Sequence, residues 1–493
     1  MTGGRATSEG AYAAVVAPHP IADRVAAAGP LLIVAYFALN GLLRSLVPGG
    51  LGLDEAELVL HAQSLELGYG PQPPLYGWLQ AAAFALFGVE KAALALVKNA
   101  VLATAFLAVW AAARGAGADA RLAFAAVLAM ALVPGITWEA QRALAHTPLA
   151  LAAAAVALAA FVACRARGGA RAHLVLGAAL AAAALAYWSA AFVGLGIVAA
   201  LVLRRRAPWR HVALALAPPV LLTAPTAVWY LSNRAALVEA ASRVEVDAAG
   251  PLGTLAALGE AVAATLALPL AVLALLLARP ANVSGARGLV PDLRTDLSWV
   301  SGLALASFAA LALATGLDEV KERYLTPVAF AVPLSVLAWA AGRLTAARAR
   351  RLAVLVGVVV LGVSAGLQWN WRIGTDGPPP QAAPFAPLAG RIAAEGDVVF
   401  AANEWVGGNL RFAAPTLAVL TPDNAAMGLD VAPPVQLVWP AAQGDAPPAE
   451  LLALFAARFG REPRLAGVDR LQAPYAPPHA DAAPFVLRRA VAR

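Results

Sequence analysis

The stretch Gly52–Leu79, GLDEAELVLHAQSLELGYGPQPPLYGWL, is a polar, acidic interruption in a chain that is otherwise strongly apolar. It follows the first apolar segment directly and closes with a stiff Pro-Gln-Pro-Pro run. Its titratable side chains include Asp54, Glu55, Glu57, His61 and Glu66. Carboxylates are costly near a bilayer, so a cluster of them after an apolar span indicates a functional site.

The composition on both sides of this stretch is that of a membrane protein. Of the 493 residues, 61% are hydrophobic and only 13% are charged, whereas a soluble globular protein carries about 25% charged residues. The net charge of +7 comes from basic residues in short turns between apolar segments, which indicates membrane topology and no nucleic-acid partner. The single cysteine, Cys164, lies in an apolar run, which excludes an intrachain disulfide and a cysteine zinc site.

A helix that spans a membrane needs about 20 mostly apolar residues. Candidate spans lie at 29–47, 91–113, 120–137, 146–164, 171–187, 188–203, 210–231, 255–278, 297–316, 323–342 and 351–369. The sequence therefore predicts a polytopic α-helical membrane domain over residues 29–371, with about 11 to 13 spans. Segment 74–89 is apolar but short, and we expect it to lie on the membrane surface within a first outer loop at 48–90.

The loops between the predicted spans alternate in charge. The basic set contains Arg114 and Arg121; Arg165, Arg167 and Arg171; Arg204, Arg205, Arg206 and Arg210; Arg279, Arg287 and Arg294; and Arg343, Arg348, Arg350 and Arg351. By the positive-inside rule these loops are cytoplasmic, as is an Ala/Gly-rich N-terminus at 1–28 that we expect to be disordered. The acidic loop then faces outward, together with the loops near 139–146, 234–247 and 318–323 and the whole tail after Trp371.

The tail, residues 372–493, differs in composition from the rest of the chain. Its apolar runs have the length of strands and lie at 397–400, 417–420, 435–439 and 485–487, while 448–459 has a helical pattern. The Asp-Gly-Pro-Pro-Pro run at 376–380 is typical of a linker. The sequence therefore predicts a small C-terminal α/β domain outside the membrane.

Three outward-facing stretches contain the charges that topology does not explain. On a helix that starts near Asp54, Glu57 and His61 are four residues apart and share a face. Asp54 alternatively serves as the N-cap of that helix, with the other acids on a solvated face. Lys321 and Arg323 are outer cations, suited to an anionic ligand such as a lipid phosphate or to salt bridges with neighbouring acids.

The third stretch contains Glu139, Arg142 and His146. Arg142 is again an outer cation, whereas we expect His146 to satisfy a helix-start hydrogen bond, since no second histidine lies at metal-ligand spacing in the sequence. The sequence therefore predicts no metal ligands and no required cofactor. The clustered acids could nevertheless hold Mg²⁺ or Ca²⁺ through oxygen ligands.

The order and spacing of four motifs resemble a known family. The motifs are Asp54-Glu55, Gly68-Tyr69 with Gln72-Pro-Pro-Leu75, His146-Thr-Pro148 and Lys321-Glu-Arg-Tyr-Leu-Thr-Pro327. Over residues 29–345 the chain resembles the bacterial glycosyltransferases related to protein O-mannosyltransferases, within the GT-C superfamily. This family includes the lipid A aminoarabinose and galacturonic acid transferases. Many members have Lys at the position of Gln72 and Asp at the position of His146, so a positive and a negative charge are replaced together.

The resemblance implies an inverting sugar transfer from a polyprenyl-phosphate donor to a lipid or envelope-glycan acceptor, by a monomer among membrane lipids. It implies a Gram-negative inner membrane and a periplasmic active site. Asp54 would be the base, with Glu55 as the alternative, and Lys321, Arg323 and Arg142 would contact the donor phosphate. The expected substrate pocket adds Glu57, His61, Tyr69, Gln72, Tyr76, Glu139, His146, Glu322 and Tyr324. A secondary transporter, a lipid flippase and a catalytically inactive homologue are the alternatives.

Overall fold

The computed structural model of the chain describes residues 20–234, 238, 250–280, 288–317 and 319–493. The expected disordered N-terminus lies outside the described residues over 1–19, as do the acidic loop at 239–247, Arg287 and Asp318. Residues 20–27 form helix α1 (Pro20–Ala27), which corrects the prediction of disorder for this part of the N-terminus. The helix packs against α6 (Ala120–Met130) and α17 (Ala346–Arg372) and buries Ala26.

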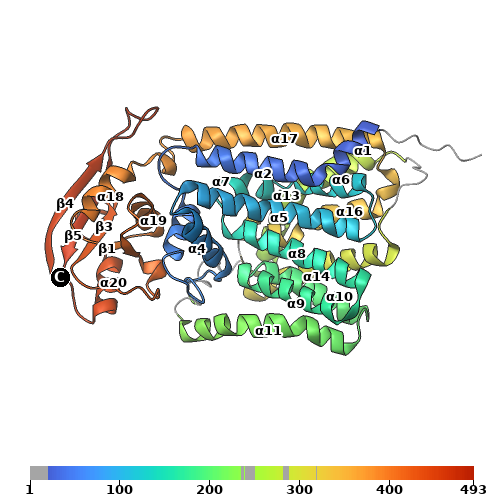
Figure 1. The fold of residues 1–493 in the computed structure, drawn as a ribbon, viewed down its shortest axis with the longest axis horizontal. Coiled ribbons are helices and arrows are strands. Elements are labelled where there is room, and N and C mark those ends of the chain that lie inside the picture. The colour runs from blue at the N-terminus through green and yellow to red at the C-terminus, as the bar shows by residue number, and fades with distance from the viewer. Residues whose placement is uncertain (1–19, 235–237, 239–249, 281–287, 318) are drawn as a thin grey trace, which may run out of the picture.

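The part of the chain up to Arg372 is a bundle of helices (Figure 1). Its helices are α2 (Gly29–Ser45), α3 (Leu53–His61), α4 (Leu75–Phe87), α5 (Lys91–Gly115), α6 (Ala120–Met130), α7 (Ala140–Arg142), α8 (His146–Arg167), α9 (Gly169–Ala186), α10 (Ala190–Leu203), α11 (Trp209–Ser232), α13 (Gly250–Leu277), α14 (Pro291–Thr315), α15 (Glu322–Ala329), α16 (Val332–Trp339) and α17 (Ala346–Arg372). In Figure 1, α2 and α17 run along one side of the bundle and α11 along the opposite side.

The polytopic helical architecture is confirmed, and every predicted span contains helix. Within the described residues seven helices are long and apolar enough to cross a membrane, or up to eight if a bent pair counts as one span. Predicted span 120–137 is that pair: α6 is followed by a π-helix at Gly135–Glu139, with a bend of 78°. Pro134 at the bend lacks an N–H for a helical hydrogen bond. Predicted span 323–342 divides into α15 and α16, with Pro333 in the first turn of α16.

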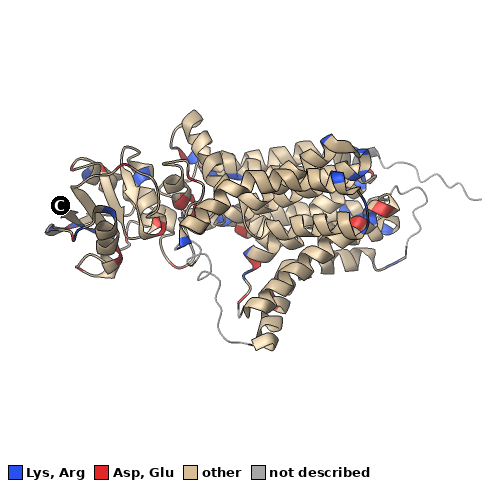
Figure 2. Ribbon diagram, turned by 90° about the horizontal axis from the view of Figure 1, so that it is seen from below, with Lys and Arg blue, Asp and Glu red and all other residues tan. Residues whose placement is uncertain are grey.

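The predicted cytoplasmic loops meet at one end of the bundle. The N–H of Val290 donates to the carbonyl of Ala116 at 2.8 Å, and Arg348 donates to the carbonyl of Arg279 at 2.8 Å. The buried carboxylate of Asp296 accepts hydrogen bonds from Arg165, Arg204 and Arg206. Figure 2 shows Lys and Arg gathered at this end, far from the C-terminal domain. The predicted alternation of loops therefore matches the arrangement of the helices.

The C-terminal domain is built on a five-stranded sheet in the order β2-β1-β3-β5-β4. Its elements are α18 (Phe385–Ala393), β1 (Val398–Ala401), α19 (Glu404–Ala413), β2 (Ala418–Leu420), β3 (Val435–Pro440), α20 (Ala449–Phe459), β4 (Leu465–Ala473) and β5 (Phe485–Ala492). Strand β1 pairs in parallel with β2 and β3, while β5 is antiparallel to β3 and β4. The predicted small α/β domain is confirmed. Strand β4 is not predicted from the sequence, because most of its residues are exposed on the edge of the sheet.

Helix α19 docks this domain on helix α3, which carries the acidic cluster. A Cβ added to Gly408 would lie 2.6 Å from the Cα of Ala56, so the two helix backbones are in close contact. The side chain of Asn409 accepts from the N–H of Leu51 at 2.7 Å, and the indole of Trp405 donates to the carbonyl of Leu51 at 3.0 Å. These contacts fix the start of α3 relative to the sheet.

Candidate active site

Asp54 lies in the first turn of α3 and points toward the start of α8. Its Oδ2 accepts a hydrogen bond of 2.8 Å from the N–H of Ala145. The alternative that Asp54 caps α3 is wrong, because the helix begins at Leu53 and Gly52 occupies the N-cap position. The N–H of Gly52 donates to Glu55 at 3.1 Å, so Glu55 is the acid that satisfies the helix start.

Asp54 opens into a pocket of about 620 Å³ between the loops at the domain end of the bundle. The charged side chains that line the pocket are Asp54, Glu139, Arg142, Glu260, Glu319, Lys321, Glu322 and Arg323. The fold thus brings the three outward-facing stretches singled out in the sequence around one cavity. Glu55, Glu57, His61, Tyr69, Gln72, Tyr76, His146 and Tyr324 are not among the described residues that line it.

The cations of the pocket have nearby partners. Arg142 forms a 2.7 Å ion pair with Glu139, and Nζ of Lys321 lies 3.5 Å from Glu319. The guanidinium of Arg323 donates to the hydroxyl of Tyr324 at 3.2 Å. Arg323 is therefore held by a neutral hydroxyl, and its charge remains available to an anionic ligand more fully than that of Arg142.

Glu55 is engaged by a different cation. The guanidinium of Arg44, on α2, donates from two nitrogens to the two carboxylate oxygens of Glu55, and both side chains are buried. Burial alone would raise the pKa of Glu55, but the charge and hydrogen bonds of Arg44 outweigh it and lower the pKa to about 2. A carboxylate held this strongly in its charged form is a poor proton acceptor.

A second group, called here the inner cluster, consists of Glu57, His61, His146 and Glu404. Oε1 of Glu57 lies 3.7 Å from Nε2 of His146 and 3.8 Å from Nε2 of His61. Nε2 of His61 also lies 3.8 Å from Oε1 of Glu404, which comes from α19 of the C-terminal domain. All four residues are buried. Sequence spacing could not show this group, because its members come from α3, α8 and α19.

Aromatic rings enclose the inner cluster. Tyr69 stacks on His61 with ring centroids 4.5 Å apart. The ring centroids of Tyr76 and Tyr187 lie 5.7 and 6.0 Å from that of His146. Burial raises the pKa of Tyr69 to about 12 and that of Tyr76 still further, so both phenols stay neutral. The predicted pocket residues Tyr69 and Tyr76 therefore form a wall around the cluster, of which His146 is itself a member.

Several charged residues of this region were not predicted. Glu260 lines the pocket from α13, where it is the only acid in a long apolar helix. That isolation is itself a recognisable signal, because an acid within a span indicates function. Lys98 on α5 is buried and donates to the carbonyl of Gln141 at 3.3 Å. Arg44 and Glu404 could be found only from tertiary contacts.

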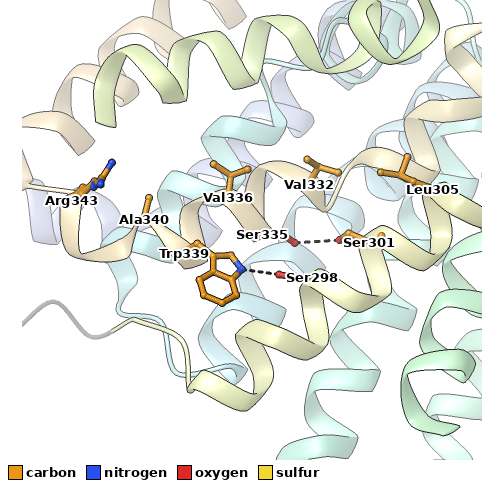
Figure 3. Close-up of a pocket in the computed structure, with 10 residues that line it drawn as sticks. Ser298, Ser301, Leu305, Val332, Ser335, Val336, Trp339, Ala340 and Arg343 are labelled. Carbon is orange, nitrogen blue, oxygen red and sulfur yellow. Dashed lines mark hydrogen bonds between the residues drawn. The ribbon is translucent and has the colours of Figure 1, made fainter. Parts of the chain in front are cut away.

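Another pocket of about 620 Å³ lies between α14 and α16, on the side of the predicted cytoplasmic loops (Figure 3). Ser301 and Ser335 are hydrogen-bonded to each other at 3.2 Å, and Trp339 donates to Ser298 at 2.9 Å. Its polar groups thus satisfy one another, and Arg343 is the titratable residue among those that line it. This chemistry does not suggest catalysis, so the pocket at Asp54 is the candidate active site.

Comparison with known proteins identifies the family. Residues 71–229 match the family described as dolichyl-phosphate-mannose-protein mannosyltransferase. The lipopolysaccharide core galacturonosyltransferase RgtA of Rhizobium johnstonii is 32% identical over 451 residues, which cover 85% of this chain and 87% of the relative. The chain belongs to the GT-C membrane glycosyltransferases. The galacturonosyltransferase RgtB of the same organism is 30% identical and covers 83% of the chain and 86% of its own length.

Solved structures share the fold of this GT-C glycosyltransferase. The crystal structure of ArnT from Cupriavidus metallidurans bound to undecaprenyl phosphate aligns with a TM-score of 0.59 and 14% identity, over 94% of this chain and 97% of that one. The apo structure of the same protein aligns with a TM-score of 0.55 and 15% identity. These structures share the fold, and the two galacturonosyltransferase relatives and the family match show that the chain is a multi-pass membrane enzyme of the glycosyltransferase class.

Gln72, which replaces the Lys of many GT-C relatives, is tied into the backbone. Its N–H and C=O both pair with Tyr69 at 2.9 Å in an isolated bridge. The residue is buried, and its Oε1 has no hydrogen-bond partner among the described residues. The neutral amide therefore occupies a buried position beside Tyr69, where a lysine would require a counter-charge.

Proposed function

We propose that this glycosyltransferase moves a sugar from a polyprenyl-phosphate donor to a lipid or envelope-glycan acceptor on the outer face of the cytoplasmic membrane. One observation carries the proposal: a carboxylate, Asp54, and three cations, Arg142, Lys321 and Arg323, line a single pocket. A reaction whose leaving group is a phosphate needs these two kinds of group, a base and a set of cations. The relatives named as lipopolysaccharide core galacturonosyltransferases support galacturonic acid as the first sugar to test.

The proposed reaction is a single displacement with inversion at the anomeric carbon. The acceptor hydroxyl oxygen attacks the anomeric carbon, and its proton passes to the carboxylate of Asp54. The bond from the anomeric carbon to the phosphate oxygen breaks, and its electron pair leaves on the phosphate. Phosphate is a good leaving group, so one base together with charge stabilisation supplies what the reaction requires.

Asp54 is favoured over Glu55 as the base by its surroundings. Asp54 accepts one backbone hydrogen bond and faces the pocket, whereas the oxygens of Glu55 are directed at Arg44 and Gly52. The role that fits Glu55 is to hold the start of α3, and with it Asp54, in place.

The leaving phosphate gains negative charge as the bond breaks, so cations matter most at that stage. Arg323 is the principal candidate, because Tyr324 orients its guanidinium without neutralising it. Lys321 lines the same pocket, and its Nζ lies near Glu319. An incoming phosphate would replace Glu319 as the partner of Lys321. Arg142 is the third cation and is the one most strongly paired, with Glu139.

The location of the pocket suits a lipid-linked donor. The pocket is lined in part by Leu53 and Asp54 of α3, the helix on which α19 of the C-terminal domain packs. The basic loops gather at the opposite end of the bundle (Figure 2). If the basic loops are cytoplasmic, as the positive-inside rule predicts, the pocket and the domain face the periplasm. The donor's lipid chain can then stay in the bilayer while its phosphate reaches Lys321 and Arg323.

The deciding experiment compares Asp54→Asn with wild type in lipid nanodiscs, using polyprenyl-phosphate galacturonic acid and lipopolysaccharide core as substrates. Loss of a general base predicts a rate lower by about 10²–10⁴-fold. Asp119→Asn is the matched control, because Asp119 also accepts one backbone N–H, from Leu122 at 2.8 Å, at the opposite end of the bundle. The control is expected to keep the wild-type rate.

Two negative results would have different meanings. A wild-type rate in Asp54→Asn would refute the assignment of the base alone. A folded wild-type protein that transfers no sugar from a panel of polyprenyl-phosphate donors would refute the proposed reaction. The anomeric configuration of the product, measured by NMR, tests the inversion.

A further inference from the structure

The inner cluster has no part in the displacement described above, yet its chemistry is specific. Two imidazoles and two carboxylates converge in a buried space one helical turn along α3 from Asp54. We propose that the inner cluster binds a divalent transition-metal ion, with Zn²⁺ as the best match, through Glu57, His61 and His146, and with Glu404 as the fourth ligand. This proposal goes beyond the sugar transfer and does not depend on it.

The distances fit a metal site that needs only a small contraction. Around a tetrahedral zinc ion, with metal–ligand bonds of about 2.0–2.2 Å, neighbouring ligand atoms lie about 3.3–3.6 Å apart. Here Oε1 of Glu57 lies 3.7 Å from Nε2 of His146 and 3.8 Å from Nε2 of His61. The three ligand atoms all lie within 4.8 Å of one another. The two pairs with Glu57 would close by a few tenths of an ångström, and the pair of histidine nitrogens by up to about 1–1.5 Å, which side-chain rotation can supply.

The types of ligand select the class of metal. Calcium and magnesium prefer oxygen ligands throughout, whereas imidazole suits zinc and other first-row transition metals. Both histidines direct Nε2 at the same carboxylate oxygen of Glu57, as ligands of one ion would. Glu404 completes a set of two nitrogens and two oxygens, since its Oε1 lies 3.8 Å from Nε2 of His61.

Charge and burial support the same conclusion. Buried carboxylates are stabilised when they are paired or coordinate a metal. As ligands, the carboxylates of Glu57 and Glu404 would contribute two negative charges, which one divalent ion would balance with both imidazoles bound in the neutral form. The rings of Tyr69 on His61 and of Tyr187 on His146 restrict the imidazoles to their observed orientations. A ligand shell held in this way binds metal with little loss of side-chain entropy.

The ligands come from parts of the chain that the ion would join. Glu57 and His61 lie on α3, His146 begins α8, and Glu404 begins α19 of the C-terminal domain. Asp54 precedes Glu57 by three residues on α3 and accepts a hydrogen bond from Ala145, the residue before His146. The metal would therefore hold the helix that presents Asp54 and would act on position, with no contact to the reacting atoms.

The test measures metal content directly. The full-length protein, purified through a tag without histidine and without chelators, is analysed by inductively coupled plasma mass spectrometry. We expect about one zinc per chain in wild type and a large loss in His146→Ala and in Glu57→Gln. His479→Ala, at a half-buried histidine of the C-terminal domain that lies outside the inner cluster, is the matched control and should keep its metal.

A spectroscopic measurement on the wild-type protein tests the proposal without requiring that any variant folds. After exchange with Co²⁺, an inner-cluster site should give the intense visible absorption of four-coordinate cobalt, and added Zn²⁺ should abolish it. Glu404→Gln should lower the affinity and alter this spectrum, because one ligand changes. Wild type that binds neither Zn²⁺ nor Co²⁺ would overturn the proposal, and so would metal that remains bound in both His146→Ala and Glu57→Gln.

Discussion

Gly408→Ala tests whether the docking of the C-terminal domain holds the catalytic helix in place. Gly408 lies in α19, and a Cβ at this position would sit 2.5 Å from the carbonyl carbon of Ala56 and 2.6 Å from its Cα. Carbon atoms in contact are normally about 3.5–4.0 Å apart. Since the obstacle is the backbone of α3, the two helices must separate by about 1 Å before the methyl group fits.

The cost of this separation follows from the contacts it disturbs. Overpacking a tight interface typically costs about 1–3 kcal/mol. The hydrogen bonds of Asn409 and Trp405 with Leu51 are each worth about 1 kcal/mol and would also weaken. The gain of about 0.5–1 kcal/mol from replacing glycine in a helix opposes the loss. We therefore expect docking to be weakened by about 2–4 kcal/mol, with slower sugar transfer because Asp54 is less firmly placed.

The assay compares Gly408→Ala with Gly390→Ala, a substitution in α18 at an exposed glycine whose added Cβ meets nothing within 4 Å. Thermal unfolding in detergent, protease cleavage in the linker at 374–380 and transfer rate are measured for both. Gly408→Ala should unfold earlier, be cleaved faster and transfer more slowly, whereas Gly390→Ala should match or exceed wild type. Equal behaviour of the two variants would refute the docking argument.

Three further predictions concern the Arg44–Glu55 pair, the proposed donor-binding cations and the domain interface. Glu55 has a folded-state pKa of about 2 against an ordinary value of 4.5, so its pairing with Arg44 stabilises the protein by about 3 kcal/mol. This stabilisation is fully present above pH 4.5 and is lost as the pH falls toward 2. Arg44→Met should cost about 3–5 kcal/mol, and adding Glu55→Gln should restore stability in a thermal unfolding series. Arg323→Ala should weaken donor binding by about 10–100-fold and Lys321→Ala by less, measured as KM for the donor. Gln63→Ala should cost about 1–2 kcal/mol of domain docking, measured by linker proteolysis, because its amide makes two 2.9 Å hydrogen bonds with the edge of β2.

Several charged residues that line the pocket could be found in the sequence, for a physical reason. Charges close to a bilayer are costly, so those that topology does not require stand out against the apolar background. Asp54, Arg142, Lys321 and Arg323 were found in this way, and all four line one cavity. Hydrophobic runs likewise placed the helices, because a span must satisfy its backbone internally and therefore forms a long apolar helix.

What the sequence did not reveal depends on contacts between distant segments. Glu404 and His61 are separated by most of the chain and meet only because α19 packs on α3. In the sequence, Arg44 has the pattern of an ordinary charged residue at a helix end. Only the fold shows that its guanidinium donates to Glu55. The sequence alone does not distinguish the roles of Glu55 and Asp54. Their different hydrogen-bond partners in the fold do.

The two positions where the chain departs from many relatives lie in the same neighbourhood. Gln72 pairs through its backbone with Tyr69, whose ring stacks on His61, and the ring of His61 lies 6.3 Å from that of His146. The family resemblance implies Lys and Asp at these positions, one charge of each sign, whereas this chain has an amide and an imidazole. Removing both charges together avoids an unpaired charge in a buried site.

This coupling gives a double-mutant prediction. Gln72→Lys alone places an unpaired cation in a buried position and should cost about 3 kcal/mol or more. His146→Asp adds a carboxylate to the neighbouring cluster, so the double variant should be more stable than the sum of the two single changes by about 1–3 kcal/mol. The energies are measured by thermal unfolding of all four proteins under one condition. Strict additivity would mean that the two positions were exchanged independently and that charge balance did not link them.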